Sequence, residues 1–229
     1  MDGGTTGYQP NTQRYWDAMP RLDLSQAQKK QPEIARQGDP AADGYDLLRT
    51  RILGEVAERE WARVGVTQAA TGRAAPLTAL NLALSEARRP KRSILLLDLD
   101  IARQPVLRYL GADLETGRAD GSFRLWRAND QLGVMAIKAS PAEAATRLLD
   151  PAFRAEMDEV LAKAAPDIVI LHVPPLLAGD AGLAGLPLAQ GLILVVDAQA
   201  DTAARLRECQ ARMRDICPLL GLFHFDAEV

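Results

Sequence analysis

The sequence predicts an α/β fold of three layers, in which helices cover both faces of a doubly wound, mostly parallel sheet. Short apolar runs of strand length recur along the chain, for example at 94–97 and 192–196. Segments with apolar residues at helical spacing lie between these runs. The chain has 229 residues, of which 48% are hydrophobic, so it can bury one sizeable core. Strands that alternate with helices in this way are typical of a parallel sheet covered on both sides.

The elements are expected in a regular order from residue 43 onward. Apolar and β-branched runs predict strands at 64–67, 93–98, 132–137, 167–172, 191–197 and 219–225. Helical spacing predicts helices over 43–60, 77–88, 104–111, 141–149, 152–164, 180–188 and 201–216. The segment 112–130 is expected to be irregular, because Gly117 and the pair Asp120-Gly121 interrupt it. We therefore assign 43–229 to one domain.

Residues 1–42 are rich in Gln, Asp, Gly, Pro and Thr and lack a sustained hydrophobic period. This composition predicts a flexible N-terminal arm. Two adjacent aromatic residues, Tyr15 and Trp16, stand out within it. They are either a docking motif for a partner protein or a patch that packs on the surface of this domain.

The composition argues against several classes of protein. The formal net charge is −3 and no basic stripe is present, which disfavours a nucleic-acid-binding role. No apolar run is long enough to cross a bilayer, and residues 1–30 lack the pattern of a signal peptide. Cys209 and Cys217 form no CxxC motif and indicate no disulfide framework. A cytoplasmic protein without a membrane span of its own is expected.

A loop of small residues follows the strand at 64–67 and opens into the next helix. This strand–loop–helix order is where a phosphate-binding P-loop sits. A working P-loop ends in Gly-Lys-Ser/Thr, whereas residues 72–77 read Gly-Arg-Ala-Ala-Pro-Leu. Ala75 stands where a lysine would neutralise phosphate, and Pro76 has neither the hydroxyl that ligates magnesium nor a backbone N–H. The expected vestigial phosphate loop comprises Thr71, Gly72, Arg73, Ala74, Ala75 and Pro76.

Four later segments carry a resemblance to a known family. Residues 93–100 read SILLLDLD, 167–175 read DIVILHVPP, 191–197 read GLILVVD, and 219–226 read LLGLFHFD. Together with the degenerate loop, and in this order, they resemble the cytoplasmic domains of the bacterial tyrosine kinases of capsule and exopolysaccharide synthesis. These CpsD/CapB-like kinases are relatives of the ParA/MinD ATPases. The resemblance covers most of the chain and implies a P-loop NTPase-like fold of the MinD/ParA type.

In active relatives, carboxylates at the positions of Asp98 and Asp100 help to hold magnesium and prepare the hydroxyl nucleophile. The resemblance therefore implies vestigial catalytic positions at Asp98, Asp100 and His172, where His172 replaces the family's second critical aspartate. Imidazole is a poor ligand for the hard Mg²⁺ ion. Asp98 and Asp100 are alternatively turn-capping residues. His172 is either a metal-binding or pH-sensitive group, or a hydrogen-bonded structural residue.

The helix expected over 43–60 resembles the family's subunit-interface helix. The matching residues are Tyr45, Leu48, Arg49, Thr50 and Ile52. The resemblance implies that they form a self-association surface of a homo-oligomer; the alternative is an ordinary amphipathic helix. The family's kinases also end in a tyrosine-rich tail, whereas the four tyrosines here do not cluster at the chain end.

These departures predict a non-catalytic pseudokinase, a cytoplasmic scaffold or regulator of exopolysaccharide synthesis and export. Its implied partner is a membrane polysaccharide co-polymerase or another export component, which would bring it to the membrane. No cofactor and no metal are expected. A first alternative is an active, divergent kinase that uses Arg73, Asp98 and Asp100 and binds Mg-ATP. A second is a MinD/ParA-like positioning protein.

Overall fold

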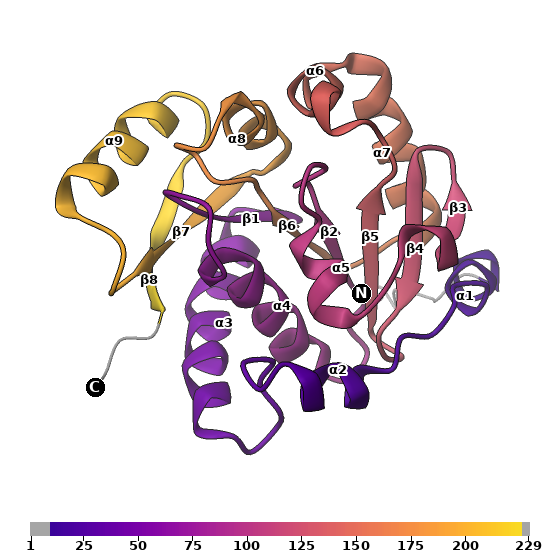
Figure 1. Cartoon of the computed structure of the whole chain (residues 1–229). Coiled ribbons are helices and arrows are strands. Elements are labelled where there is room, and N and C mark those ends of the chain that lie inside the picture. The colour runs from indigo at the N-terminus through magenta and orange to yellow at the C-terminus, as the bar shows by residue number, and fades with distance from the viewer. Residues whose placement is uncertain (1–9, 226–229) are drawn as a thin grey trace, which may run out of the picture.

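A twisted sheet of eight strands forms the centre of the protein, and helices lie on both of its faces (Figure 1). The computed structural model describes residues 10–225. The expected three-layer α/β fold with a mostly parallel sheet is confirmed. The first nine residues of the expected arm and the chain end after Phe225 lie outside the described residues.

The strands run in the order β3-β4-β5-β2-β6-β1-β7-β8 across the sheet. Their bounds are β1 Arg63–Gln68, β2 Ile94–Asp98, β3 Arg118–Asp120, β4 Phe123–Arg127, β5 Leu132–Ile137, β6 Ile168–His172, β7 Gly191–Asp197 and β8 Leu219–Phe225. The six strands from β5 to β8 in this order are parallel, whereas β3 and β4 pair antiparallel at one edge. The central strands are buried on both faces, which explains their unbroken apolar runs.

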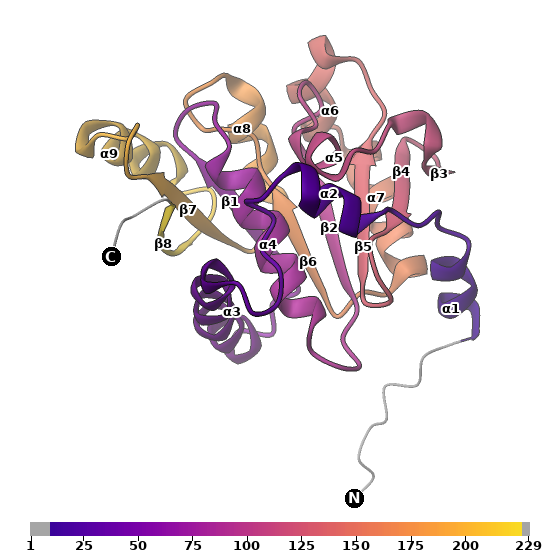
Figure 2. The ribbon, with the colours of Figure 1, turned by 60° about the horizontal axis from the view of Figure 1, so that its bottom comes forward.

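The helices divide between the two faces of the sheet. The first face carries α2 Leu24–Lys30, α3 Pro40–Glu58, α4 Ala74–Ala87 and α5 Pro105–Leu110. The second carries α1 Pro10–Asp17, α6 Ala144–Leu149, α7 Pro151–Ala164, α8 Asp180–Gly185 and α9 Ala203–Met213. Figure 2 shows α3 and α4 in front of the sheet and α7 behind it. Short 3-10 helices cover Leu114–Thr116, Pro141–Glu143 and Leu186–Leu188. No helix within residues 10–225 is both long and apolar enough to cross a bilayer.

The segment 112–130 is more regular than expected. It contains the hairpin of β3 and β4, in which Asp120 pairs with Phe123 across a two-residue turn. Gly121 opens this turn with φ +56°, a left-handed conformation that glycine adopts without steric cost. The expectation of an irregular segment was wrong, because Gly121-Ser122 as a two-residue connection between two strand segments is a hairpin signal.

Residues 10–42 also differ from the expected loose arm. Trp16 in α1 is 1% exposed, and its indole N–H donates to the carbonyl of Ala164 at the end of α7 at 2.8 Å. The Tyr15 hydroxyl donates to Asp120 at 2.8 Å, and the Arg118 guanidinium lies over the Tyr15 ring. Burial, followed by the hydrogen bond to Asp120, raises the pKa of Tyr15 well above its ordinary value. Of the two interpretations of Tyr15 and Trp16, the structure therefore agrees with the one in which they pack on the domain's own surface.

This packing predicts a large stability contribution from Trp16. We expect Trp16→Ala to lower the free energy of unfolding by about 3–5 kcal/mol, because a large buried side chain leaves a cavity. Trp16→Phe should cost about 1–3 kcal/mol, since the Ala164 carbonyl loses its donor. Urea denaturation measures both changes. Leu149→Ala is the control, because the Leu149 side chain is 55% exposed and should contribute little. If Trp16→Ala were as stable as the wild type, α1 would be only loosely attached to the domain.

Candidate functional site

The loops that follow β1, β2 and β6 meet at the carboxyl edge of the sheet, where ligands bind in open α/β folds. Strand β6 lies between β1 and β2, and its last residue, His172, is level with Val66 on one side and Asp98 on the other. The loop that follows β1 leads directly into α4. The structure therefore brings the degenerate loop, Asp98 and His172 into one region.

The side chain of Gln68, the last residue of β1, fills the turn of the vestigial phosphate loop. Its Oε1 accepts the backbone N–H of Ala75 at 2.5 Å, and its Nε2 donates to the carbonyl of Ala70 at 2.7 Å. A Cβ added at Gly72 would lie 3.0 Å from this Nε2 atom, so the amide packs directly against the loop backbone. Gln68 is buried. An amide of the protein itself thus occupies the inside of the loop.

The first turn of α4 has few donors left for an anion. The N–H of Ala75 is bonded to Gln68, and the N–H of Leu77 donates to the carbonyl of Arg73 at 3.1 Å. Pro76 has no N–H to donate. Three of the first four backbone positions of α4 therefore cannot donate to a bound phosphate. Phosphate recognition at a helix N-terminus depends on those groups.

Arg73 is held by a segment that precedes the expected domain. Its guanidinium forms an ion pair with Glu33 at 2.6 Å and lies over the ring of Phe225. The backbone of this segment is anchored on α4, where Asn81 accepts the N–H of Ala35 at 2.9 Å and donates to the carbonyl of Glu33 at 2.8 Å. Residues Thr71, Gly72 and Arg73 are exposed, whereas Ala74, Ala75 and Pro76 are buried in the first turn.

Asp98 and His172 form a buried pair. The Nδ1–H of His172 donates to Oδ1 of Asp98 at 2.7 Å, and both side chains are almost completely buried. Oδ1 also accepts the N–H of Asp100, and Oδ2 accepts the N–H of Val106 in the first turn of α5, each at 3.0 Å. Three protein donors thus satisfy the Asp98 carboxylate. Asp98 therefore acts as a turn-capping residue, and His172 is a hydrogen-bonded structural residue.

Asp100 faces a different partner. Its carboxylate accepts the backbone N–H of Arg103 at 3.1 Å and lies 3.4 Å from the guanidinium of the same residue. The three expected vestigial residues therefore do not converge on a common point. Within residues 10–225, no cluster of three or more His, Cys, Asp or Glu side chains is arranged to hold a metal ion.

Most of the expected interface residues face inward. Tyr45, Leu48 and Ile52 of α3 are buried, and the Tyr45 ring lies 5.5 Å from the ring of Phe223 in β8. Thr50 is exposed, and its hydroxyl donates to the carbonyl of Asp46 at 2.8 Å. The expectation that all five residues form a self-association surface was wrong for the three apolar ones, because they pack into this chain's own core.

Asp46 fastens α3 to α4. Ser85 and Arg88 of the α4 region donate to its carboxylate, and Arg49 lies 3.5 Å from it. Burial acts to raise the pKa of Asp46, but the hydrogen bond from Ser85 and the charges of Arg88 and Arg49 outweigh it and hold this pKa below its usual value. Arg49 also donates to the carbonyl of Ser85 at 3.1 Å. Arg49, which was expected at the interface, therefore connects two helices of the same chain.

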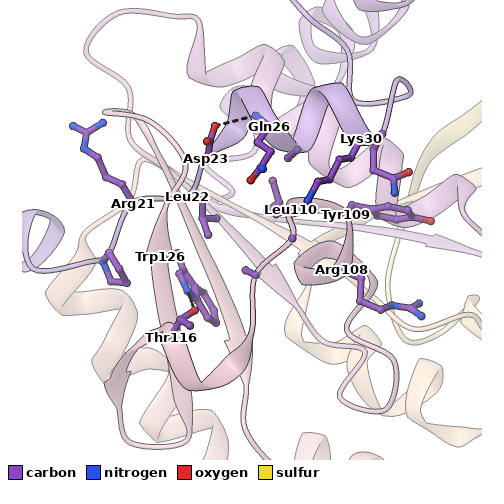
Figure 3. A pocket seen from close by; sticks show the side chains of 15 residues that line it. Arg21, Leu22, Asp23, Gln26, Lys30, Arg108, Tyr109, Leu110, Thr116 and Trp126 are labelled. Carbon is purple, nitrogen blue, oxygen red and sulfur yellow. Dashed lines mark hydrogen bonds between the residues drawn. The ribbon is translucent and has the colours of Figure 1, made fainter.

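A cavity of about 260 Å³ lies apart from the vestigial site, between α2, α5 and β4 (Figure 3). Lys30 reaches from α2 toward Leu110, and the indole of Trp126 forms one wall. Arg21 turns away and pairs with Asp130 at 2.6 Å. None of the residues that line the cavity belongs to the vestigial loop or to the ends of β2 and β6. The cavity therefore does not coincide with the expected nucleotide site.

Comparisons with solved structures show a shared fold. The BceF tyrosine kinase domain is 17% identical with a TM-score of 0.67, and the match covers 94% of this chain and 97% of that one. The kinase domain of the Escherichia coli tyrosine kinase Etk is 18% identical with a TM-score of 0.71, over 83% and 77% of the two chains. A ParA family ATPase from Chlorobium tepidum is 16% identical with a TM-score of 0.52, over 72% of each chain. No protein-family model and no curated protein matches the chain.

The buried pair predicts that aspartate is not tolerated at position 172. We expect His172→Asp to lower the free energy of unfolding by about 3–5 kcal/mol at neutral pH, because it removes a donor and places a second carboxylate beside Asp98. The loss should shrink as the pH falls, since one of the two carboxyl groups then takes up a proton. Urea denaturation across pH measures both effects.

His172→Asn is the matched control, because its side-chain amide retains an N–H donor near the Nδ1 position. It should be clearly more stable than His172→Asp. Equal stability of the two variants at neutral pH would contradict the role assigned to the pair. Strong stabilisation of His172→Asp by excess Mg²⁺ would reveal instead a metal site that lacks only one ligand.

Proposed function

We propose that this protein is a non-catalytic relative of the bacterial tyrosine kinases, a pseudo-ATPase that acts through protein contacts. The observation that carries the proposal is the position of Gln68. Its amide accepts the N–H of Ala75, the residue at the lysine position of a working loop, and fills the turn where a phosphate would sit. A nucleotide would have to displace two hydrogen bonds of a buried side chain before it made any of its own.

The electrostatics of the region support the same proposal. A nucleotide triphosphate brings several negative charges that relatives neutralise with a lysine and a magnesium ion. Here Ala75 and Pro76 supply neither, and the nearest loop cation, Arg73, is paired with Glu33. The Asp98 carboxylate is satisfied by the three protein donors described above. Without an anion site and without metal ligands, both of the interactions that would stabilise a bound phosphate are missing.

The cellular role that we propose follows from the resemblance in sequence. The protein would be a cytoplasmic scaffold or regulator in exopolysaccharide synthesis and export. Its partner would be a membrane polysaccharide co-polymerase or another export component, bound through the shared fold without phosphoryl transfer. The shared fold with the BceF and Etk kinase domains supports this placement.

The proposal predicts that nucleotides do not stabilise the protein. A ligand at about 100 times its dissociation constant adds roughly 2.7 kcal/mol, which for a domain of this size raises the unfolding midpoint by about 5–10 °C. We expect no shift of the midpoint with saturating Mg-ATP or Mg-ADP, because the loop is occupied by Gln68. Differential scanning fluorimetry measures it, and an active kinase domain such as that of Etk, treated in parallel, is the positive control.

A magnesium-dependent shift would contradict the pseudo-ATPase proposal. If that shift also weakened in Asp98→Asn, the chain would be an active, divergent kinase, and transfer of phosphate to tyrosine would be the next measurement. Formation of a dimer only in the presence of nucleotide would point instead to a positioning protein of the MinD/ParA type.

A further inference from the structure

The two edges of the sheet differ in how they are protected against pairing with another chain. At one edge, β3 is only three residues long and carries Arg118 and Asp120. Short length and charge are common means by which proteins block edge-to-edge association. At the other edge, β8 is seven residues long, from Leu219 to Phe225, and contains no charged residue and no proline. One edge is closed to a partner strand and the other is open.

The open edge presents unpaired backbone groups. Within the described residues, β8 pairs with β7 alone. The carbonyl of Phe225 accepts the N–H of Ala198, just beyond β7, so the peptide groups of Phe225 point toward β7. Because these directions alternate along a strand, the peptide groups of Leu222 and His224 point to the free edge. A row of unpaired backbone groups along an exposed edge strand is a template for pairing with another strand.

The side chains at this edge are apolar as well as accessible. Leu222 is 44% exposed and Leu219 is 38% exposed. Beside them, α3 contributes Leu47, which is 55% exposed, to an apolar groove of about 220 Å³ between α3 and β8. Arg51 is the one charged residue that lines this groove. A strand added to β8 would therefore gain apolar contacts in addition to backbone hydrogen bonds.

We propose that β8 pairs with β8 of a second copy of this chain, antiparallel and about a twofold axis near Leu222. A twofold interface brings the same surface of both copies together, so it must be self-complementary. The uncharged strand meets this condition, because no like charges within β8 oppose each other. A twofold at Leu222 also sets the two outward-facing Leu222 peptide groups opposite each other and continues the sheet through both copies. The proposal is independent of nucleotide binding.

The first test measures the mass of the purified protein, without nucleotide, by multi-angle light scattering over a range of concentrations. We expect about twice the monomer mass of 24.8 kDa for the wild type. Leu222→Lys should shift the protein to the monomer mass, since two lysines would face each other at the axis. Leu149→Lys is the matched control, because Leu149 is at least as exposed but lies on α6, away from β8 (Figure 1). It should remain dimeric.

A second variant keeps the proposal testable if the lysine variant does not fold. Leu222→Cys should be joined between copies by a short bifunctional maleimide, because directly paired residues of antiparallel strands bring their Cβ atoms to about 4.5–5.5 Å, within the reach of such a linker. The native thiols give little background, since burial raises the pKa values of Cys209 and Cys217 to about 11. Leu149→Cys, treated alike, should remain uncrosslinked.

Any one of four results would overturn the proposal. Three of them are a wild-type protein that stays monomeric at every concentration, a dimer that survives Leu222→Lys, and equal cross-linking of the two cysteine variants. Mass that grows beyond the dimer would also overturn it, because a closed twofold pair leaves no second free β8 edge.

Discussion

The complete burial of α4 is the constraint on which the vestigial site depends. Every residue from Ala74 to Ala87 is buried, so the helix must satisfy its N-terminal backbone groups without help from bulk water. In a nucleotide-binding relative, phosphate oxygens accept those N–H groups. Here Gln68 accepts one of them, and Pro76 removes another because proline has no backbone N–H. The substitutions in the loop therefore do more than delete a ligand site, because they supply internal replacements for the ligand. A helix with an empty anion site and no replacement would carry unsatisfied donors at the centre of the fold.

The polar groups at the end of β6 are also satisfied by the protein itself. Two carboxylates at the ends of adjacent strands are stable in relatives because a cation lies between them, and without that cation one of them would have to be protonated. Histidine at position 172 resolves this conflict, because its Nδ1–H donates to Asp98 and adds no negative charge. Asp98 in turn caps the first turn of α5 through Val106. Ala75 and His172 are thus physically consistent with each other, since each belongs to a region whose polar groups are satisfied by the protein alone.

The sequence was enough to predict the fold class and the meeting of Asp98 with His172 at one edge of the sheet, because both depend on strong local periods. Apolar runs mark the central strands, and strands with parallel ends bring Asp98 and His172 together. Gln68 could not be found in this way, since a glutamine at a strand end has no motif and its role depends on a loop that closes around it. The packing of Trp16 depends on Ala164, which lies 148 residues away in the chain. The hairpin at 118–127 did carry a local signal in its turn residues, Gly121-Ser122. On α3, helical spacing identified an apolar stripe, but spacing cannot tell a core-facing stripe from an interface.

The surface around α3 is connected to the region of Gln68 and Arg73 by side-chain contacts. Asp46 links α3 to Ser85 and Arg88 at the far end of α4, and Asn81 on the same helix anchors the segment that holds Arg73. Tyr45 packs on Phe223 and so joins α3 to β8. A partner that contacts the exposed side of α3 or the edge of β8 would therefore contact elements that are connected to α4. This helix directly follows the loop at 71–73. If the protein acts as the scaffold that we propose, these contacts would connect the exposed side of α3 and the β8 edge to the loop that Gln68 fills.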